Sequence, residues 1–362
     1  MPNSPFGVSV WVKILLDKFL YHRPTGRLIA DLATHGLNLS AGTIAGGLQR
    51  LVGLFEPIYQ KLIDHNRLQS MWNADETRWA VFEKIAGKEG NRWYFWLFES
   101  SDCAVFVLDK GRSRKPPEDP FGKKAKGVVV VDRYSSYKAM EHVKEGRLRL
   151  AFCWAHVRRD FLDVEKSYPK RSDWTIAWVE RIGQLYRLNK TRLEAKKEGK
   201  GFAEKDKDLR EAVERMRLRR EEELADEKLH VAQRKVLESL GEHWEGLTIF
   251  VEEPSVPMDN NQAERTLRKV VLGRKNYLGS GSQRSGELAA MIFSLTATLL
   301  KRGICPRKWL TGFLEACAEA GGKSPKEVEK WLPWNLTEGQ KKEMRQKEED
   351  EGEPPEEKEI GT

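Results

Sequence analysis

The sequence has few cysteines and no long apolar run, and each absence argues against a class of protein. Only four cysteines occur among 362 residues, Cys103, Cys153, Cys305 and Cys317, and no two are spaced as C-x-x-C. A structural zinc ribbon or a redox pair is therefore not expected, and a reduced cytoplasmic chain is the simplest interpretation. No apolar run approaches about 18 residues, and the beginning of the chain lacks the pattern of a signal peptide. Secretion and membrane spanning are both disfavoured.

Acidic residues are outnumbered by basic ones over most of the chain. The net charge is +8, but residues 338–362 hold ten acids against five bases and carry −5, so residues 1–337 carry about +13. A basic body of this size favours a polyanionic partner, although charge alone identifies no ligand. The highly charged segment 338–362, which is low in aromatics, predicts a disordered acidic tail.

Residues 9–70 predict short helices. The first stops at Pro24, the second has Thr25 as a candidate cap, and the third has Ser40 as a candidate N-cap. A short turn between two small helices, the second capped by serine, is the helix-turn-helix pattern, in which the second helix enters the major groove of DNA. A small helical bundle that never contacts DNA is an equal alternative. In the first interpretation, the helix presents three polar side chains to DNA: Thr43, Gln49 and Arg50.

From residue 70 onward the pattern changes to that of strands. The runs "MWNADETRWAVFEKIAG", "NRWYFWLFES" and "CAVFVLDKG" are aromatic and β-branched, and they predict three consecutive antiparallel strands. The four valines of "GVVVVDRYSSY" favour a strand buried on both faces, and a helix is expected over "YSSYKAMEHVKEG". Another strand runs into a helix in "RLRLAFCWAHVRRDF". This succession predicts an α/β fold with a mixed sheet and helices packed against it.

The second half of the chain is predominantly helical. Residues 172–245 are dense in both charges, which predicts an insertion or arm of long solvated helices. "QAERTLRKVVLGRK" predicts a helix and "GSGSQRSG" a flexible loop. "ELAAMIFSLTATLLKRG" predicts a strongly apolar helix after that loop.

Three acids stand out by their context. Asp75 lies in the first predicted strand, Asp132 ends the valine run, and Glu264 begins a helix. Carboxylates beside apolar strands are costly unless they are paired or bind metal, and a divalent cation relieves their repulsion. Hard carboxylate oxygens suit Mg²⁺ or Mn²⁺, and two such ions can clamp both oxygens of a phosphoryl transfer. Each acid also has an ordinary alternative: a strand residue facing a turn, a helix cap, or a first-turn acid that favours the helix dipole.

Basic residues flank these acids. His156 is a candidate to steer a phosphate or nucleophile, or else simply packs beneath Trp154. Asp259, which precedes the Glu264 helix, is interpreted as a capping or supporting group. The side chains expected to meet phosphates are Arg158, Arg159, Arg265, Arg268, Lys269, Arg274 and Lys275.

Four motifs in this order resemble those of bacterial transposases. They are "ADET" at 74–77, "VVVVDRYSSY" at 128–137, "CWAHVRRDF" at 153–161 and "DNNQAERTLR" at 259–268. Over roughly residues 8–335 the chain resembles the insertion-sequence-66 transposase family, whose members carry an aspartate-aspartate-glutamate site on a ribonuclease H-like fold. The stretch "GSGSQRSGELAAMIFSLTATLLKRG" and the "WLPW" at 331–334 are also similar to that family.

The resemblance implies roles for particular residues. Asp75, Asp132 and Glu264 match the family's catalytic, metal-binding acids, the first on the central strand, the second at the end of the fourth strand and the third on a later helix. The resemblance implies a cofactor of two Mg²⁺ or Mn²⁺ ions. It implies double-stranded DNA as the partner, both as transposon ends and as target, with a homo-oligomer bound to that DNA and accessory transposition proteins as further candidate partners. It also implies a cytoplasmic, nucleoid-associated location. Water would cut a strand to free a 3′-hydroxyl, which then attacks a target phosphodiester.

The expected domains are a helix-turn-helix-like domain over 1–69, a ribonuclease H-like catalytic domain over 70–322 with the helical insertion at about 172–245, and a C-terminal segment over 323–362.

Family members typically begin with a coiled-coil-like segment and a cysteine-rich zinc module. No cysteine precedes Cys103, so a shortened copy is expected. The alternatives are a nuclease of the same fold, a decayed copy that only binds DNA, and a structural protein with a helical arm.

Overall fold

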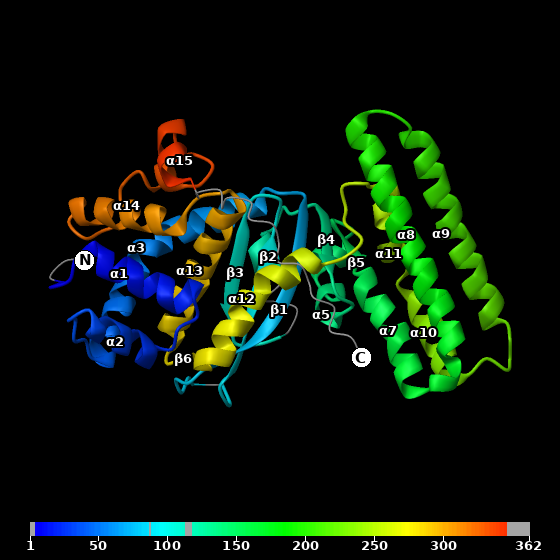
Figure 1. Cartoon of the computed structure of the whole chain (residues 1–362), viewed down its shortest axis with the longest axis horizontal. Helices are drawn as coiled ribbons and strands as arrows, with labels where there is room; N and C mark the ends of the chain where they lie inside the picture. Colours follow the sequence, from blue (N-terminus) through cyan, green and yellow to red (C-terminus); the bar gives the residue numbers. More distant parts are fainter. Residues whose placement is uncertain (1–3, 87, 113–117, 346–362) are drawn as a thin grey trace.

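A computed structural model describes residues 4–86, 88–112 and 118–345. A mixed sheet occupies the middle of the molecule, with a bundle of helices on one side and the N- and C-terminal helices on the other (Figure 1). This confirms the expected mixed α/β architecture. The strands are β1 (Met71–Val81), β2 (Arg92–Glu99), β3 (Ala104–Asp109), β4 (Gly127–Val131), β5 (Leu148–Phe152) and β6 (Gly279–Ser280).

The strand order is β3-β2-β1-β4-β5, and β6 pairs with the far end of β1. The first three strands are antiparallel to one another, as their sequences predicted, whereas β1, β4 and β5 are parallel. Gly127 opens β4 with φ +146°, and a Cβ there would lie 1.9 Å from the carbonyl oxygen of Ser70. This position therefore requires glycine, which lets Val128 donate its N–H to that same carbonyl at 2.9 Å.

The side chains of β1 point alternately to the two faces of the sheet, and each face packs in a different hydrophobic core. Trp79 and Val81 point into one core, which also contains residues of β2, β3, the N-terminal helices and the C-terminal helices. Trp72 and Ala74 point into the other, together with β4, β5 and the helical bundle. All four valines of β4 are buried, as a strand covered on both faces requires.

The N-terminal and C-terminal helices pack together on the first core. Gly36 ends α2 with φ +78° and Ser40 caps α3 by accepting the N–H of Thr43 at 3.0 Å, as predicted. Thr25, however, is the first residue of α2 rather than its cap. The helices are α1 (Val8–Leu15), the π-helix η1 (Leu16–Leu20), α2 (Thr25–Thr34), α3 (Ala41–Arg67), α13 (Gln283–Lys301), α14 (Pro306–Glu319), the 3₁₀-helix η4 (Val328–Trp331) and α15 (Glu338–Met344).

Two expectations in this region were wrong. Helix α3 is not small, because 27 residues continue through Pro57 and bury an apolar face against α13. The segment expected to be a disordered tail begins with α15, where Met344 is buried. Residues 346–362 of that expected tail lie outside the described residues.

The charged segment is helical, but it is not merely solvated. Helices α7 to α11 form a bundle beside β5 (Figure 1), and the bundle buries residues such as Trp178, Leu209 and Leu237. Arg192 is fully buried and donates to the carboxylate of Asp206 at 2.8 Å. The elements are α7 (Trp154–Ser167), η3 (Pro169–Arg171), α8 (Ser172–Glu198), α9 (Phe202–Leu224), α10 (Val231–Glu242) and α11 (Trp244–Glu252).

The remaining elements connect these layers. The single helix expected over residues 134–146 is two short helices, α5 (Ser135–Lys138) and α6 (Glu141–Lys144), after η2 (Asp119–Phe121). Helix α12 (Asn261–Tyr277) crosses the sheet over β1 (Figure 1).

The expected flexible loop after α12 is ordered. Gly279 and Ser280 form β6, and the Ser280 hydroxyl accepts the indole N–H of Trp79 at 3.0 Å. Ser282 and Ser285 then form a capping box at the start of α13. These contacts with β1 fix a segment whose composition resembles that of a flexible loop.

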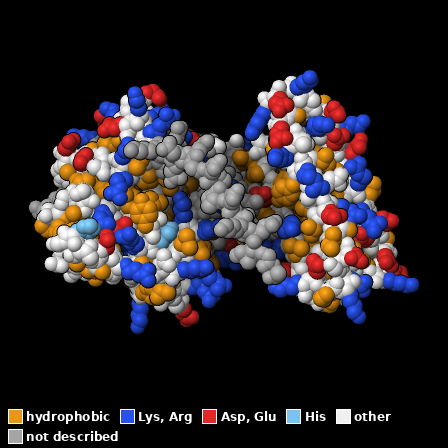
Figure 2. Space-filling model, in the orientation of Figure 1, with side chains coloured by type: hydrophobic (Ala, Val, Ile, Leu, Met, Phe, Trp, Pro, Cys, Tyr) orange, Lys and Arg blue, Asp and Glu red, His pale blue; other side chains and the backbone are white. Residues whose placement is uncertain are grey.

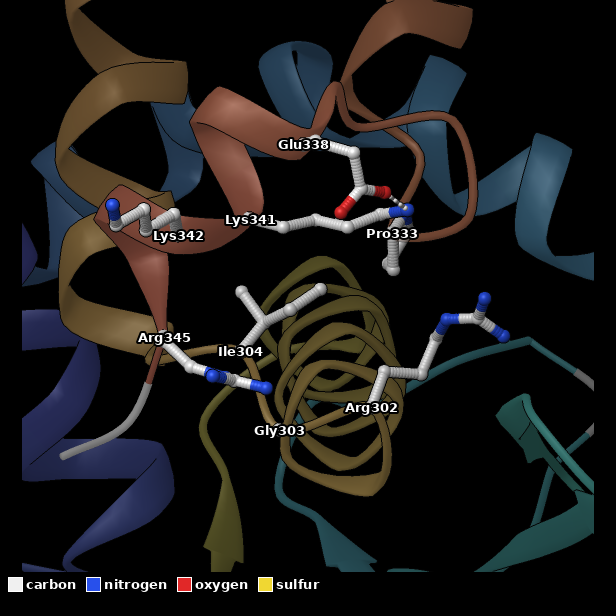
Figure 3. A pocket seen from close by; sticks show the side chains of 8 residues that line it. All are labelled: Arg302, Gly303, Ile304, Pro333, Glu338, Lys341, Lys342 and Arg345. Carbon is white, nitrogen blue, oxygen red and sulfur yellow. Dashed lines mark hydrogen bonds and ion pairs between the residues drawn. The ribbon is translucent and has the colours of Figure 1, made fainter. Parts of the chain in front are cut away.

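Two further features of the described residues bear on function. No described helix is both long enough and apolar enough to cross a membrane. A pocket of about 750 Å³ lies between the end of α13 and α15, far along the chain from the acids discussed above (Figure 3). It is lined by Arg302, Gly303, Ile304, Pro333, Glu338, Lys341, Lys342 and Arg345.

Candidate active site

Strand register brings Asp75 and Asp132 to the same level of the sheet. In the parallel β1–β4 pair, Asn73 lies opposite Val130. Two residues further along each chain are Asp75, within β1, and Asp132, immediately after β4. Neighbouring strands lie about 4.8 Å apart, so the backbone positions of Asp75 and Asp132 are next to each other at the carboxyl end of β4. This is the sheet edge where ligands bind in open α/β sheets.

Helix α12 is fixed over this edge by Asn260, the residue that precedes it. The Asn260 side chain accepts the amide of Asn73 at 2.9 Å and donates to the carbonyl of Ala74 at 2.8 Å. Asn73 and Asn260 are both almost fully buried. Glu264 lies one helical turn after Asn260, so the anchor on β1 delivers Glu264 to the vicinity of Asp75.

The same face of β1 lies beneath the rest of α12. Thr77 receives a hydrogen bond from Arg274 at 3.2 Å, and Asn73 binds Asn260. Asp75 lies between these two contacts on the same face, because side chains two residues apart in a strand share a face. Asp75 is therefore enclosed between β1 and α12 rather than free on the surface.

The charges of the three acids act on one another. Burial raises the pKa of Asp75 to about 7, with a further increase from the negative charges of Glu76, Asp132 and Glu264. The carboxylate keeps one hydrogen bond, from the N–H of Glu76 at 2.8 Å. We call Asp75, Asp132 and Glu264 the acidic triad. The structure thus brings these three sequence-predicted residues into electrostatic contact, although 57 residues separate the first two in sequence.

A buried ion pair supports the opposite face of β1. Glu76 accepts from Arg112 at 2.7 Å and from the Tyr137 hydroxyl at 2.9 Å. Burial raises the pKa of Glu76, while Arg112 lowers it. Arg112 also lies over the ring of Tyr134, 3.7 Å from its centroid. Arg112 is therefore bonded to Glu76, and its charge also reaches Asp132.

Asp132 also serves the local backbone. Its carboxylate accepts the N–H of Tyr134 at 2.9 Å, and Tyr134 is the N-cap residue of α5, so Asp132 bonds just ahead of that helix instead of capping it. Asp259 accepts the N–H of Asn261 at 3.1 Å, in agreement with its interpretation as a group that supports the start of α12. The two roles of Asp132 are compatible, because a carboxylate has several acceptor positions.

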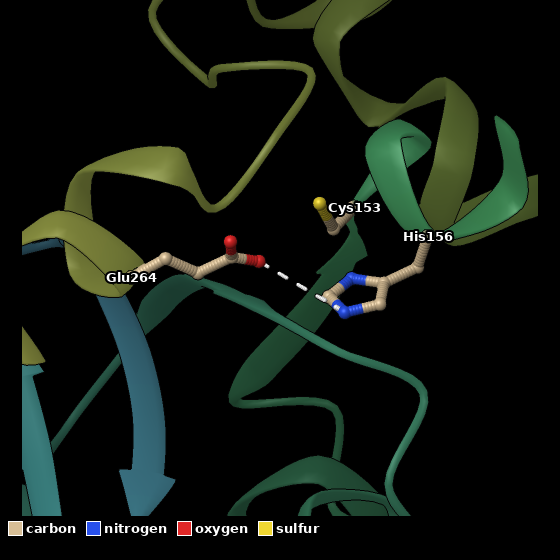
Figure 4. Close-up of side chains that lie close together, drawn as sticks. All are labelled: Cys153, His156 and Glu264. Carbon is tan, nitrogen blue, oxygen red and sulfur yellow. Dashed lines mark ion pairs between the residues drawn. The ribbon is translucent and has the colours of Figure 1, made fainter. Parts of the chain in front are cut away.

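Glu264 faces the start of α7. Its carboxylate oxygen Oε1 lies 3.9 Å from Nε2 of His156, and both side chains point into the same space as the Cys153 thiol (Figure 4). His156 is about one quarter exposed and Glu264 about one third. The structure therefore places His156 beside the acidic triad. Trp154 is buried separately, with its indole N–H donated to the carbonyl of Leu247.

The predicted basic residues fall into two groups. Arg158, Arg159, Arg265, Arg268 and Lys275 are exposed and free to meet a phosphate. The other two are engaged with the protein. Arg274 donates to Thr77 and to the carbonyl of Arg78, and burial lowers the pKa of Lys269, which lies near Glu99.

At the other end of the molecule, the residues predicted to read the major groove are exposed on α3. These are Thr43, Gln49 and Arg50. The Thr43 hydroxyl lies 2.9 Å from that of Ser40, and the carbonyl of Gln49 accepts from Arg284 at 3.4 Å.

The sequence interpretation missed two kinds of residue. One kind is Asn73 and Asn260, which hold α12 on β1: Asn73 lies just before the "ADET" motif, and Asn260 lies within "DNNQAERTLR" but was given no role. Cys153 has no C-x-x-C partner that would mark it as a metal ligand, but Cys153 and His156 have C-x-x-H spacing, which was the usable signal there.

The donor set of the acidic triad fits a hard divalent cation. No arginine or lysine is among the main groups that shift the pKa of Asp75. The three carboxylates must approach one another before they could share an ion, because only Cys153, His156 and Glu264 among the described residues place three ligand atoms within 4.8 Å of one another. A divalent cation would replace the proton that Asp75 otherwise retains near neutral pH, and would bind through oxygen ligands of the type that Mg²⁺ and Mn²⁺ prefer. Since Glu264 and Asp132 are both partly exposed, a phosphate can approach the same place.

Comparison with known proteins places these residues in a family context. Residues 3–288 match the family described as Transposase IS66 family. The uncharacterized protein y4jD of Sinorhizobium fredii (strain NBRC 101917 / NGR234) is 27% identical over 336 residues, which cover 89% of this chain and 64% of that protein.

Two further proteins of the same bacterium are similar. Uncharacterized protein y4hP is 25% identical over 344 residues (88% of this chain, 60% of that protein), and uncharacterized protein y4qI is 30% identical over 363 residues (89% and 61%). The chain therefore spans less than two thirds of the length of these curated relatives.

Proposed function

The chain belongs to the IS66 family of transposases, and on that premise we propose that it cleaves DNA strands and transfers them in a reaction that requires divalent metal ions. The observation that carries the proposal is geometric: the register of β1 against β4 puts Asp75 and Asp132 at the same level, and the Asn260 contacts with Asn73 and Ala74 hold the helix of Glu264 over that place. The negative charges of Asp132 and Glu264 add to the effect of burial on the pKa of Asp75.

The sheet order supports the same assignment. We interpret β3-β2-β1-β4-β5, antiparallel in its first half and parallel in its second, as a ribonuclease H-like core. Asp75 is on the central strand and Asp132 directly follows the fourth strand. These are the positions that the family resemblance implied for the first two catalytic acids.

In the proposed mechanism, Asp75, Asp132 and Glu264 would hold two Mg²⁺ or Mn²⁺ ions. When bound, such ions supply Lewis-acid stabilisation of the attacking and leaving oxygens in phosphoryl transfer. Asp75 must give up its proton before it can act as a ligand, and Asn260 and Asn73 keep Glu264 over the strand edge. Arg265 and Arg268 extend from the same helix as Glu264 and orient the DNA backbone.

The DNA chemistry has two steps. In the first, water attacks the phosphorus at a transposon end, the bond to the 3′ oxygen breaks, and a 3′-hydroxyl is freed. In the second, that hydroxyl attacks a target phosphodiester in line, and a 3′ oxygen of the target leaves. Neither step requires a covalent bond between protein and DNA. We further propose that Thr43, Gln49 and Arg50 contact double-stranded DNA and that the active complex contains at least two copies of the chain.

Replacement of Asp132 tests the proposal. Asp132→Asn keeps the shape of the side chain and an oxygen that can accept the N–H of Tyr134, but removes the charge. The variant should bind DNA as the wild type does and lose Mg²⁺-dependent cleavage and joining by about 10³-fold or more. The assay follows labelled transposon ends from the parent element.

Asp109→Asn is the matched control. Asp109 also ends a strand and also accepts a backbone N–H two residues on, from Gly111 at 2.7 Å, but it lies on the far edge strand β3. It should retain full activity. Full activity of Asp132→Asn would remove Asp132 from the mechanism, and cleavage without any joining in the wild type would favour a nuclease.

A further inference from the structure

Three potential metal ligands of different chemistry meet beside the acidic triad. The Cys153 sulfur, a ring nitrogen of His156 and a carboxylate oxygen of Glu264 all lie within 4.8 Å of one another (Figure 4). The contact between His156 Nε2 and Glu264 Oε1, at 3.9 Å, is too long for a hydrogen bond. The three groups thus surround a gap instead of bonding to each other.

Backbone N–H groups at the start of two helices point at the Cys153 sulfur. Cys153 is the N-cap of α7, and its sulfur accepts the N–H of Asn260 at 3.3 Å. The N–H groups of Ala155 and His156 also favour the thiolate, although burial raises the pKa of the Cys153 thiol overall.

His156 provides a second, independent observation. Its Nδ1 atom is buried and finds no hydrogen-bond partner within the described part of the chain. A buried ring nitrogen without a partner costs about 1–3 kcal/mol. Coordination to a cation in the gap would satisfy that atom, and the remaining nitrogen Nε2 would then face the exposed side of the site.

We propose that Cys153, His156 and Glu264 form a binding site for a thiophilic divalent cation such as Zn²⁺, next to the hard-cation site of the acidic triad and sharing Glu264 with it. Zinc binds sulfur at about 2.3 Å and nitrogen or oxygen at about 2.0–2.2 Å, so the three donors must close in by about 1 Å. Three protein ligands leave a fourth position open, on the side where His156 and Glu264 are exposed.

Because Glu264 belongs to both sites, a cation bound at this site would affect DNA cleavage; this step rests on the proposed function. A cation held by Cys153 and His156 engages Glu264 and withdraws it from Asp75 and Asp132. Zn²⁺ is then an inhibitor of Mg²⁺-dependent cleavage. In Cys153→Ser, inhibition should require at least about tenfold more Zn²⁺, since even residues that only orient metal ligands change affinity by about 10–100-fold.

Titration of the full chain with Co²⁺ tests the site itself, because a cobalt–thiolate bond has its own charge-transfer absorption. The wild type should develop this band with one equivalent of Co²⁺ and lose it when Zn²⁺ is added. The band should be absent in Cys153→Ser. It should be present in Cys305→Ser, which is the control at a second free cysteine, one that is only partly buried. It should also survive in Asp75→Asn, which separates failure of this site from failure of the proposed catalytic site.

Two results would overturn the proposal. One is no thiolate band in folded wild-type protein with excess Co²⁺, and the other is an unchanged band in Cys153→Ser. Because Cys153 is buried, that variant must first show the wild-type circular dichroism spectrum. If it does not, His156→Ala, at a partly exposed position, decides the matter: it must weaken Co²⁺ binding at least about tenfold, and an unchanged affinity contradicts the site.

Discussion

At the scale of single residues, the protonation of Asp75 sets the condition for metal binding. Its pKa of about 7 lies well above the ordinary value near 3.9 for an unfolded chain. Between about pH 4 and pH 7 the folded chain therefore holds a proton that the unfolded chain has lost. In the absence of metal, the free energy of unfolding falls as pH rises through this window, since deprotonation is more costly in the folded state.

Asp75→Asn should remove that dependence. In a metal chelator at pH 8 the variant should melt several degrees above the wild type, whereas near pH 4 the two should melt together. One pKa unit corresponds to about 1.4 kcal/mol, and a domain of this size changes its Tm by roughly 2–4 °C per kcal/mol. Thermal denaturation by circular dichroism gives the comparison.

Added Mg²⁺ provides the control for this prediction. It should raise the Tm of the wild type at pH 8 and leave that of Asp75→Asn unchanged, because a metal that binds only the folded state stabilises it. If the difference in Tm between the two proteins is the same at pH 4 and pH 8, Asp75 does not have the raised pKa.

At the scale of elements, the placement of α12 determines whether Glu264 reaches the aspartates. Asn260→Ala removes two buried hydrogen bonds, to Asn73 and to the carbonyl of Ala74. We expect a loss of about 2–4 kcal/mol in the free energy of unfolding, from urea denaturation. At equal folded fraction, cleavage should fall by about a hundredfold, as expected when a reacting group is misplaced by about 1 Å.

Asn276→Ala is the control at the other end of the same helix. Asn276 donates to the carbonyl of His22 at 3.0 Å, far along α12 from Glu264. Its replacement should cost stability but spare the activity of the folded protein. If the two variants lose the same amount of cleavage activity per folded protein, any disturbance of α12 lowers activity. Asn260 would then have no specific role in positioning Glu264.

The elements show what local sequence signals can predict. The valines of β4 and the aromatic and β-branched runs of β2 and β3 identify strands because burial on a sheet favours those residues. The length of α3 could not be predicted, since Gly47, Gly53 and Pro57 locally favour a break. Burial against α13 overrides them, and Gly47 is where the Trp11 ring packs, 1.8 Å from the position of a missing Cβ.

At the scale of the whole molecule, the surface of the helical bundle and the surface of α12 differ in how their charges are distributed. Over the bundle, Lys and Arg are interspersed with Asp and Glu without a continuous patch of one sign (Figure 2). On α9, Arg217 pairs with Glu214 and Arg219 pairs with Glu223. The exposed cations of α12, in contrast, form no salt bridge among the described residues, and they are the ones expected to meet DNA.

Removing charge from these two surfaces should have different effects. Arg265→Gln with Arg268→Gln should weaken DNA binding and reduce the slope of log K against log salt concentration by about 2, since each arginine would neutralise one phosphate. Arg217→Gln with Arg219→Gln removes the same charge from α9 and should leave the slope unchanged. Fluorescence anisotropy at several salt concentrations measures both, and equal slopes for the two double variants would contradict the assignment of the DNA-binding face.

The whole molecule also shows where prediction from sequence ended. The three acids could be named because each stands in an unusual local context, and their family order identified them. Their convergence depends on the register of β1 against β4 and on Asn73 meeting Asn260, 187 residues away in the chain. Contacts between distant residues leave no local signal, and for the same reason the sequence did not place Cys153 and His156 beside Glu264.

The most direct test of the central claim is an anomalous difference map of crystals grown with Mn²⁺ and a DNA end. We predict manganese peaks within about 2.0–2.3 Å of carboxylate oxygens of Asp75 and Asp132, with Glu264 and a DNA phosphate at the same centre. Peaks only elsewhere, or none at saturating Mn²⁺ with DNA bound, would contradict a metal-dependent transposase site in this chain.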